Sequence, residues 1–573
     1  MRYLFGLLRP YRRQLAVAVA VALGAIISVV SIPLLVGHGI NEIDSGSESG
    51  VILAGAAILA VGVLGALSQA GRQWIAGRLG LEVEYDLRNR YFSHLLDVEL
   101  GFLERQQTGQ LVSRGSSDLR PIRFFLGAGI PSLAQDVGTI VVAAAVMLAL
   151  DPALAAVTLA PLPLFIGAAV LYQRRSTPLL LRTRERVGEL AEIAEENVVG
   201  ASLVRAAVRE DAEVGRFRRS AASMLEAAID SVRVQARYTP TLSLLANLSM
   251  LAVLAYGGTR AAGGAITVGE FASFFTYALL LIGPASTIAY WMTMVQQAVA
   301  AGERVREVLE HPPALASHEG AAPVRNEPAA ISFKRAAVTR PDGARLLDGI
   351  DLEIDARRTI AVIGPPGSGH DSLLGLVNRL YDPDSGSVAI AGVELRDLEL
   401  ASLRQTVATA HDDDFLFSTT VRENIAYGRP DATDEEIRGA AERAQAADFI
   451  AELSEGYDSD VGTRGRSLSG GQRERLVLAR ALLDNPGILL LNNATGSLDA
   501  HTRAEALDDL AAHIGDWTTL MISYASRALR LADEVIVIRE GRIVARGTHD
   551  ELIAGDPFYR SLVGDEGNAG APK

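Results

Sequence analysis

The sequence contains no cysteine, and arginine supplies almost all of its positive charge. Without cysteine the chain has no disulfide framework, no thiolate metal site and no cysteine nucleophile. The 573 residues are 49% hydrophobic, the mean hydropathy is positive and the formal net charge is -14. This length allows two or more domains, and the apolar content is high enough for membrane segments, which excludes an ordinary soluble enzyme.

Six apolar runs are long enough to cross a bilayer, which requires about 20 residues. They lie at 15–37, 51–67, 130–150, 153–171, 242–256 and 271–295. The first run has the position of a signal peptide, but it is long, it lacks a convincing cleavage site and five more runs follow it. We therefore expect it to remain in the membrane as the first of six spans.

Arginine is distributed unevenly around these runs. It is frequent at the N-terminus, between the second and third runs and between the fourth and fifth runs. In contrast, 39–46 has none and only Arg260 lies between the last two runs. Short loops rich in Lys and Arg stay on the cytoplasmic side. The pattern predicts an integral membrane protein with both termini in the cytoplasm, and the abundance of arginine and alanine suggests a bacterial plasma (inner) membrane.

The two arginine-rich segments between runs are each about sixty residues long and follow a helical pattern. We expect them to extend the spans well beyond the membrane. An irregular linker with several prolines follows the sixth run and indicates a domain boundary. We place a transmembrane domain at 1–310, a linker at 311–328 and a soluble domain at 329–573.

The soluble part alternates apolar, β-rich runs with helical stretches, as in an α/β fold. We interpret 358–363 as a buried strand, 364–369 as a glycine loop and 372–379 as a helix. This order is typical of a phosphate-binding loop, in which glycines let backbone amides approach phosphate oxygens and the helix N-terminus adds positive potential. The glycine pattern alone is weak evidence.

A second motif makes the interpretation specific. The stretch 467–475 is Ser-Leu-Ser-Gly-Gly-Gln-Arg-Glu-Arg, which closely resembles the signature motif of ABC transporter ATPases. Six spans followed by such a domain resemble an ABC half-transporter of the exporter type over essentially the whole chain. The segments 101–114 and 199–210 are similar to the two coupling-helix regions of that family. The resemblance implies an all-α six-helix transmembrane domain followed by an α/β P-loop nucleotide-binding domain of the ABC ATPase type.

The phosphate loop departs from the family pattern at the two residues that hold nucleotide. The family has a lysine for the β- and γ-phosphates, followed by a Ser or Thr for Mg²⁺. This chain has His370 and Asp371 at these positions. Histidine is shorter and mostly neutral near pH 7, and Asp371 places a carboxylate beside the polyphosphate. We expect weaker nucleotide binding, although Asp371 could still reach a metal ion.

The strand at 487–491 should lead into an aspartate that organises Mg²⁺ and a glutamate that acts as general base. The sequence has Asn492 and Asn493 there, and an amide cannot accept a proton as a carboxylate does. Tyr524 stands at the position of the switch histidine of the family. The resemblance therefore implies that the site built on this chain's own phosphate loop does not hydrolyse ATP.

Three further positions differ from the family. Asp412 stands where the Q-loop glutamine belongs, or His411 does if the loop is shifted by one residue. Arg340 replaces the aromatic residue that stacks on adenine, and a guanidinium can still stack there. Thr463 replaces a frequent glutamate, which a tolerated surface change explains equally well. Drift after loss of function is the alternative to a non-catalytic site that is retained for a purpose.

The intact signature explains why the chain keeps the glycine loop although the side chains that bind phosphate are replaced. In this family two nucleotide-binding domains meet head to tail, and each ATP lies between the phosphate loop of one and the signature of the other. The chain therefore resembles the degenerate half of a heterodimer. Its partner would be a second half-transporter with an intact phosphate loop, strand-end carboxylates and switch histidine. ATP and Mg²⁺ would then be held mainly at the composite site of that partner.

The residues that carry these predictions form two groups. The group contributed to the partner's site is Leu468, Ser469, Gly470, Gly471 and Gln472, with Asp499 at the dimer seam. The group of the degenerate site is Arg340, Gly364, Gly367, Ser368, Gly369, His370, Asp371, Ser372, Asp412 and Asn492, with Asn493 and Tyr524 in the catalytic positions.

The membrane half gives fewer indications of the transported compound. Asp136 and Gln135 are polar residues of a kind that commonly face a bundle interior, although a place near the span end would also explain them. Tyr277, Tyr290 and Trp291 could line a pathway, but packing is the simpler explanation for each. We expect export of a hydrophobic or amphipathic compound such as a drug, lipid or peptide, with contact to membrane lipid and no nucleic-acid partner. Uptake on the same scaffold, for example of a siderophore, and a non-transporting regulatory role are the alternatives.

Overall fold

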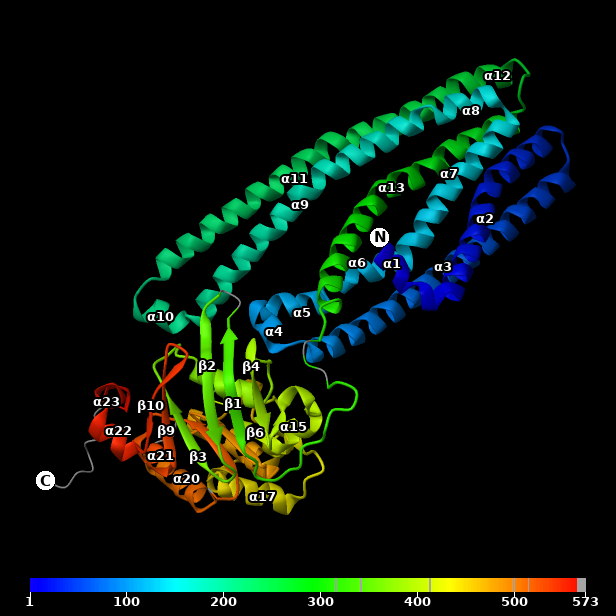
Figure 1. Ribbon diagram of the computed structural model, residues 1–573. Helices are drawn as coiled ribbons and strands as arrows, with labels where there is room; N and C mark the ends of the chain where they lie inside the picture. Colours follow the sequence, from blue (N-terminus) through cyan, green and yellow to red (C-terminus); the bar gives the residue numbers. More distant parts are fainter. Residues whose placement is uncertain are drawn as a thin grey trace. The chain divides into compact units, whose positions relative to one another are not determined.

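The computed structural model describes residues 1–313, 315, 317–340, 343–411, 414–496, 498, 500–513 and 515–563 (Figure 1). The chain divides into two compact units. The first comprises Met1–Leu96 and Gln107–His311, and the second comprises Asp97–Gln106 and Pro312–Lys573. The short segment Asp97–Gln106 thus groups with the second unit, although it lies within the first half of the sequence.

The first unit consists only of helices in the part of the chain that the structure describes. They are α1 (Arg2–Leu7), η1 (Arg9–Tyr11), α2 (Arg12–Asp44), α3 (Glu48–Asp97), α5 (Thr108–Ser116), α6 (Leu119–Phe124), η2 (Phe125–Gly129), α7 (Ile130–Leu150), α8 (Pro152–Leu159), α9 (Pro161–Val199), α10 (Ala201–Ala206), α11 (Glu210–Ala252), η3 (Val253–Gly257), α12 (Gly258–Ala262) and α13 (Val268–Leu309). The segments η2 and η3 are π-helical turns that join the helices on either side.

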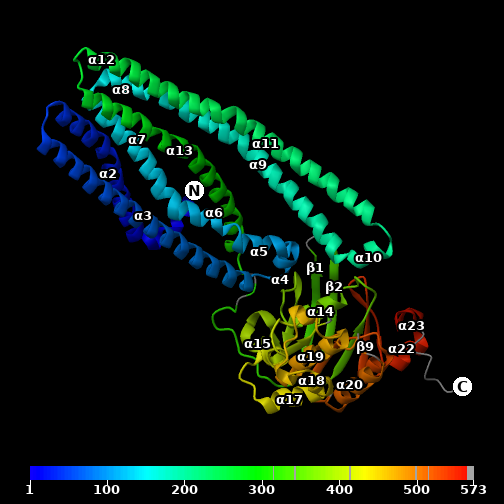
Figure 2. The same cartoon turned by 180° about the vertical axis from the view of Figure 1, so that it is seen from behind.

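Six helical segments are long and apolar enough to cross a membrane, and each contains one of the predicted apolar runs. They are Arg9–Asp44, Glu48–Asp97, Thr108–Leu150, Pro152–Val199, Glu210–Ala262 and Val268–Leu309. All are much longer than the about 20 residues that span a bilayer, so each continues beyond it. Helices α9 and α11 lie side by side in both views (Figures 1 and 2). The prediction of six spans is confirmed by length and composition.

The second unit contains α4 (Leu100–Arg105) and two sheets. The antiparallel sheet has the order β2-β1-β4-β5, with β1 (Ile331–Thr339), β2 (Arg345–Ile354), β4 (Ser385–Ile390) and β5 (Val393–Glu394). The larger sheet has the order β10-β9-β3-β8-β7-β6, with β3 (Thr359–Ile363), β6 (Val407–Ala410), β7 (Ile488–Asn492), β8 (Thr518–Ile522), β9 (Glu534–Arg539) and β10 (Arg542–Gly547). Its strands pair in parallel except β10, which is antiparallel to β9.

Helices surround the larger sheet. They are α14 (His370–Val377), α15 (Leu400–Thr406), α16 (Val421–Ile425), α17 (Asp434–Arg443), α18 (Ala447–Glu452), α19 (Gly470–Leu483), α20 (Ala500–His513), α21 (Ser526–Leu531), α22 (His549–Gly555) and α23 (Pro557–Val563), with short 3-10 turns at η4 (Leu395–Asp397), η5 (Ala426–Gly428), η6 (Gly456–Asp458) and η7 (Thr463–Gly465). Every residue of β3 and β8 is buried, as expected of parallel strands that are covered on both faces.

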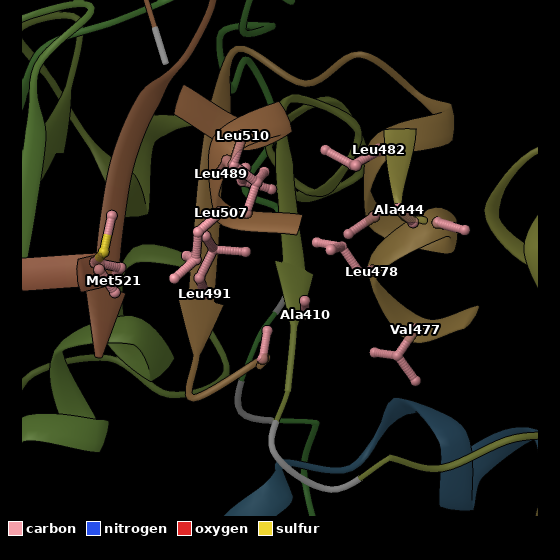
Figure 3. Close-up of a cluster of buried hydrophobic side chains, with 14 of the residues drawn as sticks. Ala410, Ala444, Val477, Leu478, Leu482, Leu489, Leu491, Leu507, Leu510 and Met521 are labelled. Carbon is pink, nitrogen blue, oxygen red and sulfur yellow. The ribbon is translucent and has the colours of Figure 1, made fainter. Parts of the chain in front are cut away.

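The core of this unit lies on both faces of the larger sheet. On one face, Leu489 and Leu491 of β7 and Met521 of β8 pack with Leu507 and Leu510 of α20 (Figure 3). Because β3, β8 and β7 are adjacent parallel strands, their carboxyl ends meet at one edge of the sheet. That edge carries the glycine loop and the residues that follow β7 and β8.

Candidate functional site

The glycine loop follows β3 and ends at Gly369, whose backbone is in the left-handed region with a φ of 90°. A Cβ atom at Gly369 would lie 1.8 Å from the carbonyl oxygen of Leu346, so only glycine fits there. Helix α14 begins at the next residue, two positions earlier than predicted. His370 and Asp371 therefore belong to the first helical turn, where the backbone amides face the loop.

The side chains at the unusual positions contact one another. Nδ1 of His370 lies 2.7 Å from Oγ of Ser368, and both residues are buried. The hydroxyl of Tyr524 donates a hydrogen bond of 2.6 Å to the carbonyl oxygen of Gly364 and lies 3.3 Å from Nε2 of His370. The rings of His370 and Tyr524 meet edge to face. These four residues, which we call the loop network, link the phosphate loop to the end of β8.

The donors and acceptors of the loop network fit one arrangement. The single hydroxyl proton of Tyr524 is used toward Gly364, so its oxygen accepts from Nε2–H of His370. Nδ1 of a neutral imidazole is then an acceptor, and the hydroxyl of Ser368 donates to it. Each polar side chain of the loop network thus has a partner within the protein.

Burial is the main cause of the pKa shifts of His370 and Tyr524. Burial lowers the pKa of His370 below its ordinary value, and the nearby carboxylate of Asp371 opposes this only in part. Burial also raises the pKa of Tyr524, and the charge of Asp371 adds to this. At neutral pH the imidazole is therefore uncharged and the phenol keeps its proton. The loop offers backbone amides to an anion but no side-chain cation from its two unusual positions.

Asp371 differs from His370 in exposure. The Asp371 side chain is 64% exposed, and its Oδ1 lies 3.7 Å from Nε2 of the buried His370. A carboxylate in the first turn of a helix is stabilised by the partial positive charge of the N-terminus, which is also where a phosphate would bind. Ser372 is buried, and its carbonyl oxygen accepts a hydrogen bond from the hydroxyl of Tyr381.

The two asparagines lie at the same edge of the sheet. Asn492 is the last residue of β7. Asn493 has a φ of 47°, in the left-handed region that asparagine tolerates better than most residues. Its N–H donates to the carbonyl oxygen of Ile522 at 2.8 Å, and its carbonyl oxygen accepts from the N–H of Gly496. The backbone thus holds this turn against β8, while the side chains carry no charge.

Sequence reasoning missed the residue that fixes the segment after this turn. Arg503 of α20 donates to the carbonyl oxygens of Thr495, Gly496 and Leu498 at 3.0, 3.2 and 2.7 Å. No spacing rule in a single sequence points to a guanidinium that caps backbone carbonyls of a preceding loop. Asp499, which we predicted at the dimer seam, lies outside the described residues.

The signature lies at the start of α19. Ser469 is the N-cap, and its hydroxyl accepts from the N–H of Gln472 while the Gln472 side chain accepts from the N–H of Ser469. This reciprocal pair is a capping box. Leu468 is buried below it, and Gly470 and Gly471 form the first turn. The helix N-terminus therefore presents a hydroxyl and backbone amides to an anion.

The structure describes only some of the other residues that were predicted to belong to the nucleotide site. Asp412 lies outside the described residues, whereas His411 follows β6 directly. Arg340 is exposed beyond β1, where its N–H donates to the carbonyl oxygen of Ala344. Thr463 is exposed at the start of η7.

The polar and aromatic residues of the membrane half pack between helices. Asp136 of α7 accepts from the Thr287 hydroxyl at 2.6 Å and from the indole N–H of Trp291 at 3.2 Å, both on α13. Tyr277 is fully buried and donates to the backbone of α2, whereas Tyr290 is 42% exposed. Oε1 of neighbouring Gln135 is buried without a hydrogen-bond partner among the described residues. Tyr277 and Trp291 thus serve packing, and Asp136 joins two helices.

Comparison with known proteins identifies the family. Residues 15–285 match the model of the ABC transporter transmembrane region, and residues 347–496 match the ABC transporter model. The chain is 30% identical over 555 residues to the uncharacterized ABC transporter ATP-binding protein YknU of Bacillus subtilis (strain 168), covering 96% of this chain and 95% of that protein. The chain is an ABC transporter.

Other relatives place the transporter among exporters. It is 31% identical to the putative multidrug export ATP-binding/permease protein YgaD of Bacillus subtilis (strain 168), with 98% of each chain covered. It is 35% identical to the multidrug efflux ATP-binding/permease protein Rv0194 of Mycobacterium tuberculosis (strain ATCC 25618 / H37Rv), with 98% of this chain but only 47% of that protein covered. The solved structure of a bacterial Atm1-family ABC exporter with ATP bound has the same fold, with a TM-score of 0.81 over 98% of this chain and 99% of that one, at 24% identity.

The predicted family and fold class are confirmed. The transporter is an integral membrane protein of the exporter type, with six apolar helices followed by an α/β ABC ATPase domain. Such a domain uses ATP and Mg²⁺ to drive transport, and ABC exporters act as dimers.

Proposed function

We propose that this transporter is the degenerate-site subunit of a heterodimeric exporter of a hydrophobic or amphipathic compound. The observation that carries the proposal is the loop network, in which neutral His370 is hydrogen-bonded between Ser368 and Tyr524. A phosphate loop needs a free cation at this place to bind the β- and γ-phosphates. Here the corresponding side chain is uncharged and its two nitrogens are already used within the protein.

The other groups at this edge also do not fit MgATP hydrolysis. Asp371 brings a carboxylate, rather than a hydroxyl, to the helix N-terminus where the phosphates would lie. Asn492 and Asn493 supply amides where hydrolysis needs a carboxylate for Mg²⁺ and a base for water. We therefore assign no catalytic step to the phosphate loop of this chain.

The signature supports a role at the opposite site of a dimer. Ser469 and the first turn of α19 have the capping geometry that orients a hydroxyl and backbone amides outward. In a head-to-tail dimer these groups would complete the site built on the partner's lysine and glutamate. The relative Rv0194 is long enough to contain two units of this size, because 98% of this chain aligns with only 47% of the length of Rv0194.

The relatives also support the class of transported compound. YgaD and Rv0194 carry names that refer to multidrug export and multidrug efflux. Such compounds are commonly apolar or amphipathic, which agrees with an all-helical membrane unit whose spans carry few charges.

The test compares the chain alone with the chain co-purified with a second half-transporter that has an intact phosphate loop, strand-end carboxylates and switch histidine. We expect negligible ATPase activity for the chain alone and robust activity for the pair. Ser469→Asn in this chain should abolish most of the activity of the pair, because asparagine preserves the N-cap but removes the hydroxyl. Ser467→Ala, two residues away on an exposed loop, is the matched control and should retain activity.

Two results would contradict the proposal. One is robust ATP turnover by the chain alone at a rate that Ser469→Asn does not change. The other is full activity of the pair with Ser469→Asn, provided that the variant subunit still co-purifies with its partner.

A further inference from the structure

A pocket of about 250 Å³ lies between α9 and α13 in the membrane unit. Its polar lining consists of Gln173, Arg174 and Thr177 from α9, and Thr293 and Gln296 from α13. These are one guanidinium, two amides and two hydroxyls. None of the residues that line the pocket is acidic. The pocket therefore carries a net positive charge at neutral pH.

The pocket lies near the C-terminal ends of the fourth and sixth apolar runs, 153–171 and 271–295. Arg174 follows Pro152, the first residue of α8, by 22 residues, and Met292 follows Val268, the first residue of α13, by 24 residues. At 1.5 Å per residue these separations correspond to about 33 Å and about 36 Å. A hydrocarbon core about 30 Å thick that begins at Pro152 and Val268 would therefore end close to the pocket, where the acyl region meets the headgroups.

Arg174 is available for a ligand. Its guanidinium is exposed and forms no hydrogen bond or ion pair with the residues that the structure describes. The adjacent Arg175 is different, because its guanidinium lies 5.8 Å from the ring centroid of Tyr238 on α11. The nearest acidic residues along the two pocket helices are Glu185 and Glu303.

The carboxylate of Asp136 does not neutralise Arg174 through a contact. It belongs to neighbouring α7, and its Oδ2 accepts from Thr287 and Trp291. Arg174 is exposed and has no acidic partner among the described residues, so its positive charge can attract an anionic headgroup at the membrane surface.

The same turn of α9 supplies an acceptor beside this charge. Pro178 has no N–H, so it cannot donate to the carbonyl oxygen of Arg174 four residues earlier. The pocket thus combines a cation with a backbone carbonyl that lacks its regular helical donor, and this carbonyl could accept from a hydroxyl substituent of an anion. The rest of the lining is apolar and includes Val170, Leu181 and the flexible side chain of Met292.

We propose that this pocket binds the head of an anionic amphiphile, with a phosphate or carboxylate on Arg174 and the apolar tail along α9 and α13 toward the membrane. The proposal rests on the export function proposed above for an amphipathic compound and restricts that compound to an anionic one. It does not depend on the degenerate nucleotide site, because ligand binding at the pocket needs neither ATP nor the second subunit.

The test uses the full chain in nanodiscs of zwitterionic lipid, in a Trp74→Phe background that removes an exposed tryptophan and leaves Trp291 and the buried Trp517. Trp291, next to Met292, then reports on a tail-brominated dodecyl phosphate through fluorescence quenching. We expect saturable quenching, and Arg174→Gln should weaken binding about tenfold or more, because it removes a hydrogen bond between charged groups. Arg174→Lys should retain part of the affinity.

Arg175→Gln is the matched control, since it makes the same change in charge one residue away. It should change the affinity by less than about twofold if surface potential makes only a small contribution. Equal losses in the two variants would overturn the proposal, as would equal binding of a brominated dodecyltrimethylammonium or dodecylphosphocholine. Competition by inorganic phosphate as effective as by dodecyl phosphate would show a free-anion site instead. If Arg174→Gln is not recovered as a monodisperse protein, the Arg174→Lys affinity and the headgroup comparison decide the outcome.

Discussion

The hydroxyl of Tyr524 donates a 2.6 Å hydrogen bond to the carbonyl oxygen of Gly364, a residue 160 positions earlier in the chain. This bond joins the end of β8 to the start of the phosphate loop. The two segments meet because β3 and β8 are adjacent parallel strands, whose carboxyl ends lie side by side. Tyr524 therefore helps to hold the start of the phosphate loop in place.

Removal of this hydroxyl should loosen the loop. Tyr524→Phe leaves the carbonyl oxygen of Gly364 and Nε2–H of His370 without a partner, which costs about 1–3 kcal/mol in a buried site. We expect amide hydrogen exchange in peptides covering 364–370 to be at least about fivefold faster in the full-length variant. Tyr427→Phe is the control, because Tyr427 is 56% exposed and its hydroxyl forms no hydrogen bond with the described residues. Similar exchange in both variants would contradict a structural role for the Tyr524 hydroxyl.

The buried imidazole should make the ATPase domain less stable in acid. The pKa of His370 is lowered in the folded chain, so the unfolded chain binds a proton more readily. Folding stability is therefore retained above the unfolded pKa of about 6.5 and falls as the pH decreases below it. The loss is at most about 1.4 kcal/mol per pH unit for one proton.

This pH dependence can be measured by thermal unfolding of the full chain between about pH 7.5 and about pH 5.5, on either side of the reference value. His370→Gln should reduce the loss of stability relative to the wild type. Some loss should remain, because burial also lowers the pKa of His549. An unchanged pH dependence in His370→Gln would show that the imidazole is protonated with little cost in the folded state.

Restoring the usual phosphate-loop pair should improve nucleotide binding. The double substitution of His370→Lys with Asp371→Ser replaces a neutral group and a carboxylate by a cation and a hydroxyl. We expect affinity for ATP in the isolated chain to increase about tenfold or more, because a charge-assisted bond to phosphate replaces a repulsive contact. Fluorescent ATP titration measures this change. The single variant Asp371→Ser separates the effect of removing the carboxylate from the effect of adding the lysine. Equal affinity for ATP in the wild type, the single variant and the double variant would contradict the prediction that His370 and Asp371 weaken nucleotide binding.

Glycine at the end of the loop should be indispensable. Gly369→Ala combines a φ of 90° with a Cβ atom 1.8 Å from the carbonyl oxygen of Leu346, so we expect a loss of about 3 kcal/mol or more. Gly439→Ala is the contrasting variant, because Gly439 lies in α17 with no atom within 4 Å of an added Cβ. It should stabilise the domain by about 0.5–1 kcal/mol. Thermal unfolding of the two full-length variants provides the comparison.

Much of the fold could be predicted because its signals are local. Apolar runs of sufficient length indicate membrane spans whatever their partners, and 15–37 and 271–295 lie within helices as expected. The strand before the glycine loop was predicted within one residue of β3. The helix after it begins at His370 rather than at 372, because Gly369 in the left-handed region can act as the N-cap.

The amino-acid sequence by itself determined the chemistry of the site. Residue identities can be read directly from the sequence: it has no lysine at 370, no carboxylates at 492 and 493 and no histidine at 524. The signature at 468–472 indicated the family against which these positions were compared. Only the tertiary structure decided what the replacements do together. The contact between His370 and Tyr524 depends on the order of strands in a sheet, and the pocket at Arg174 depends on the packing of α9 against α13. Neither arrangement has a local sequence signal, because each joins residues more than a hundred positions apart along the chain.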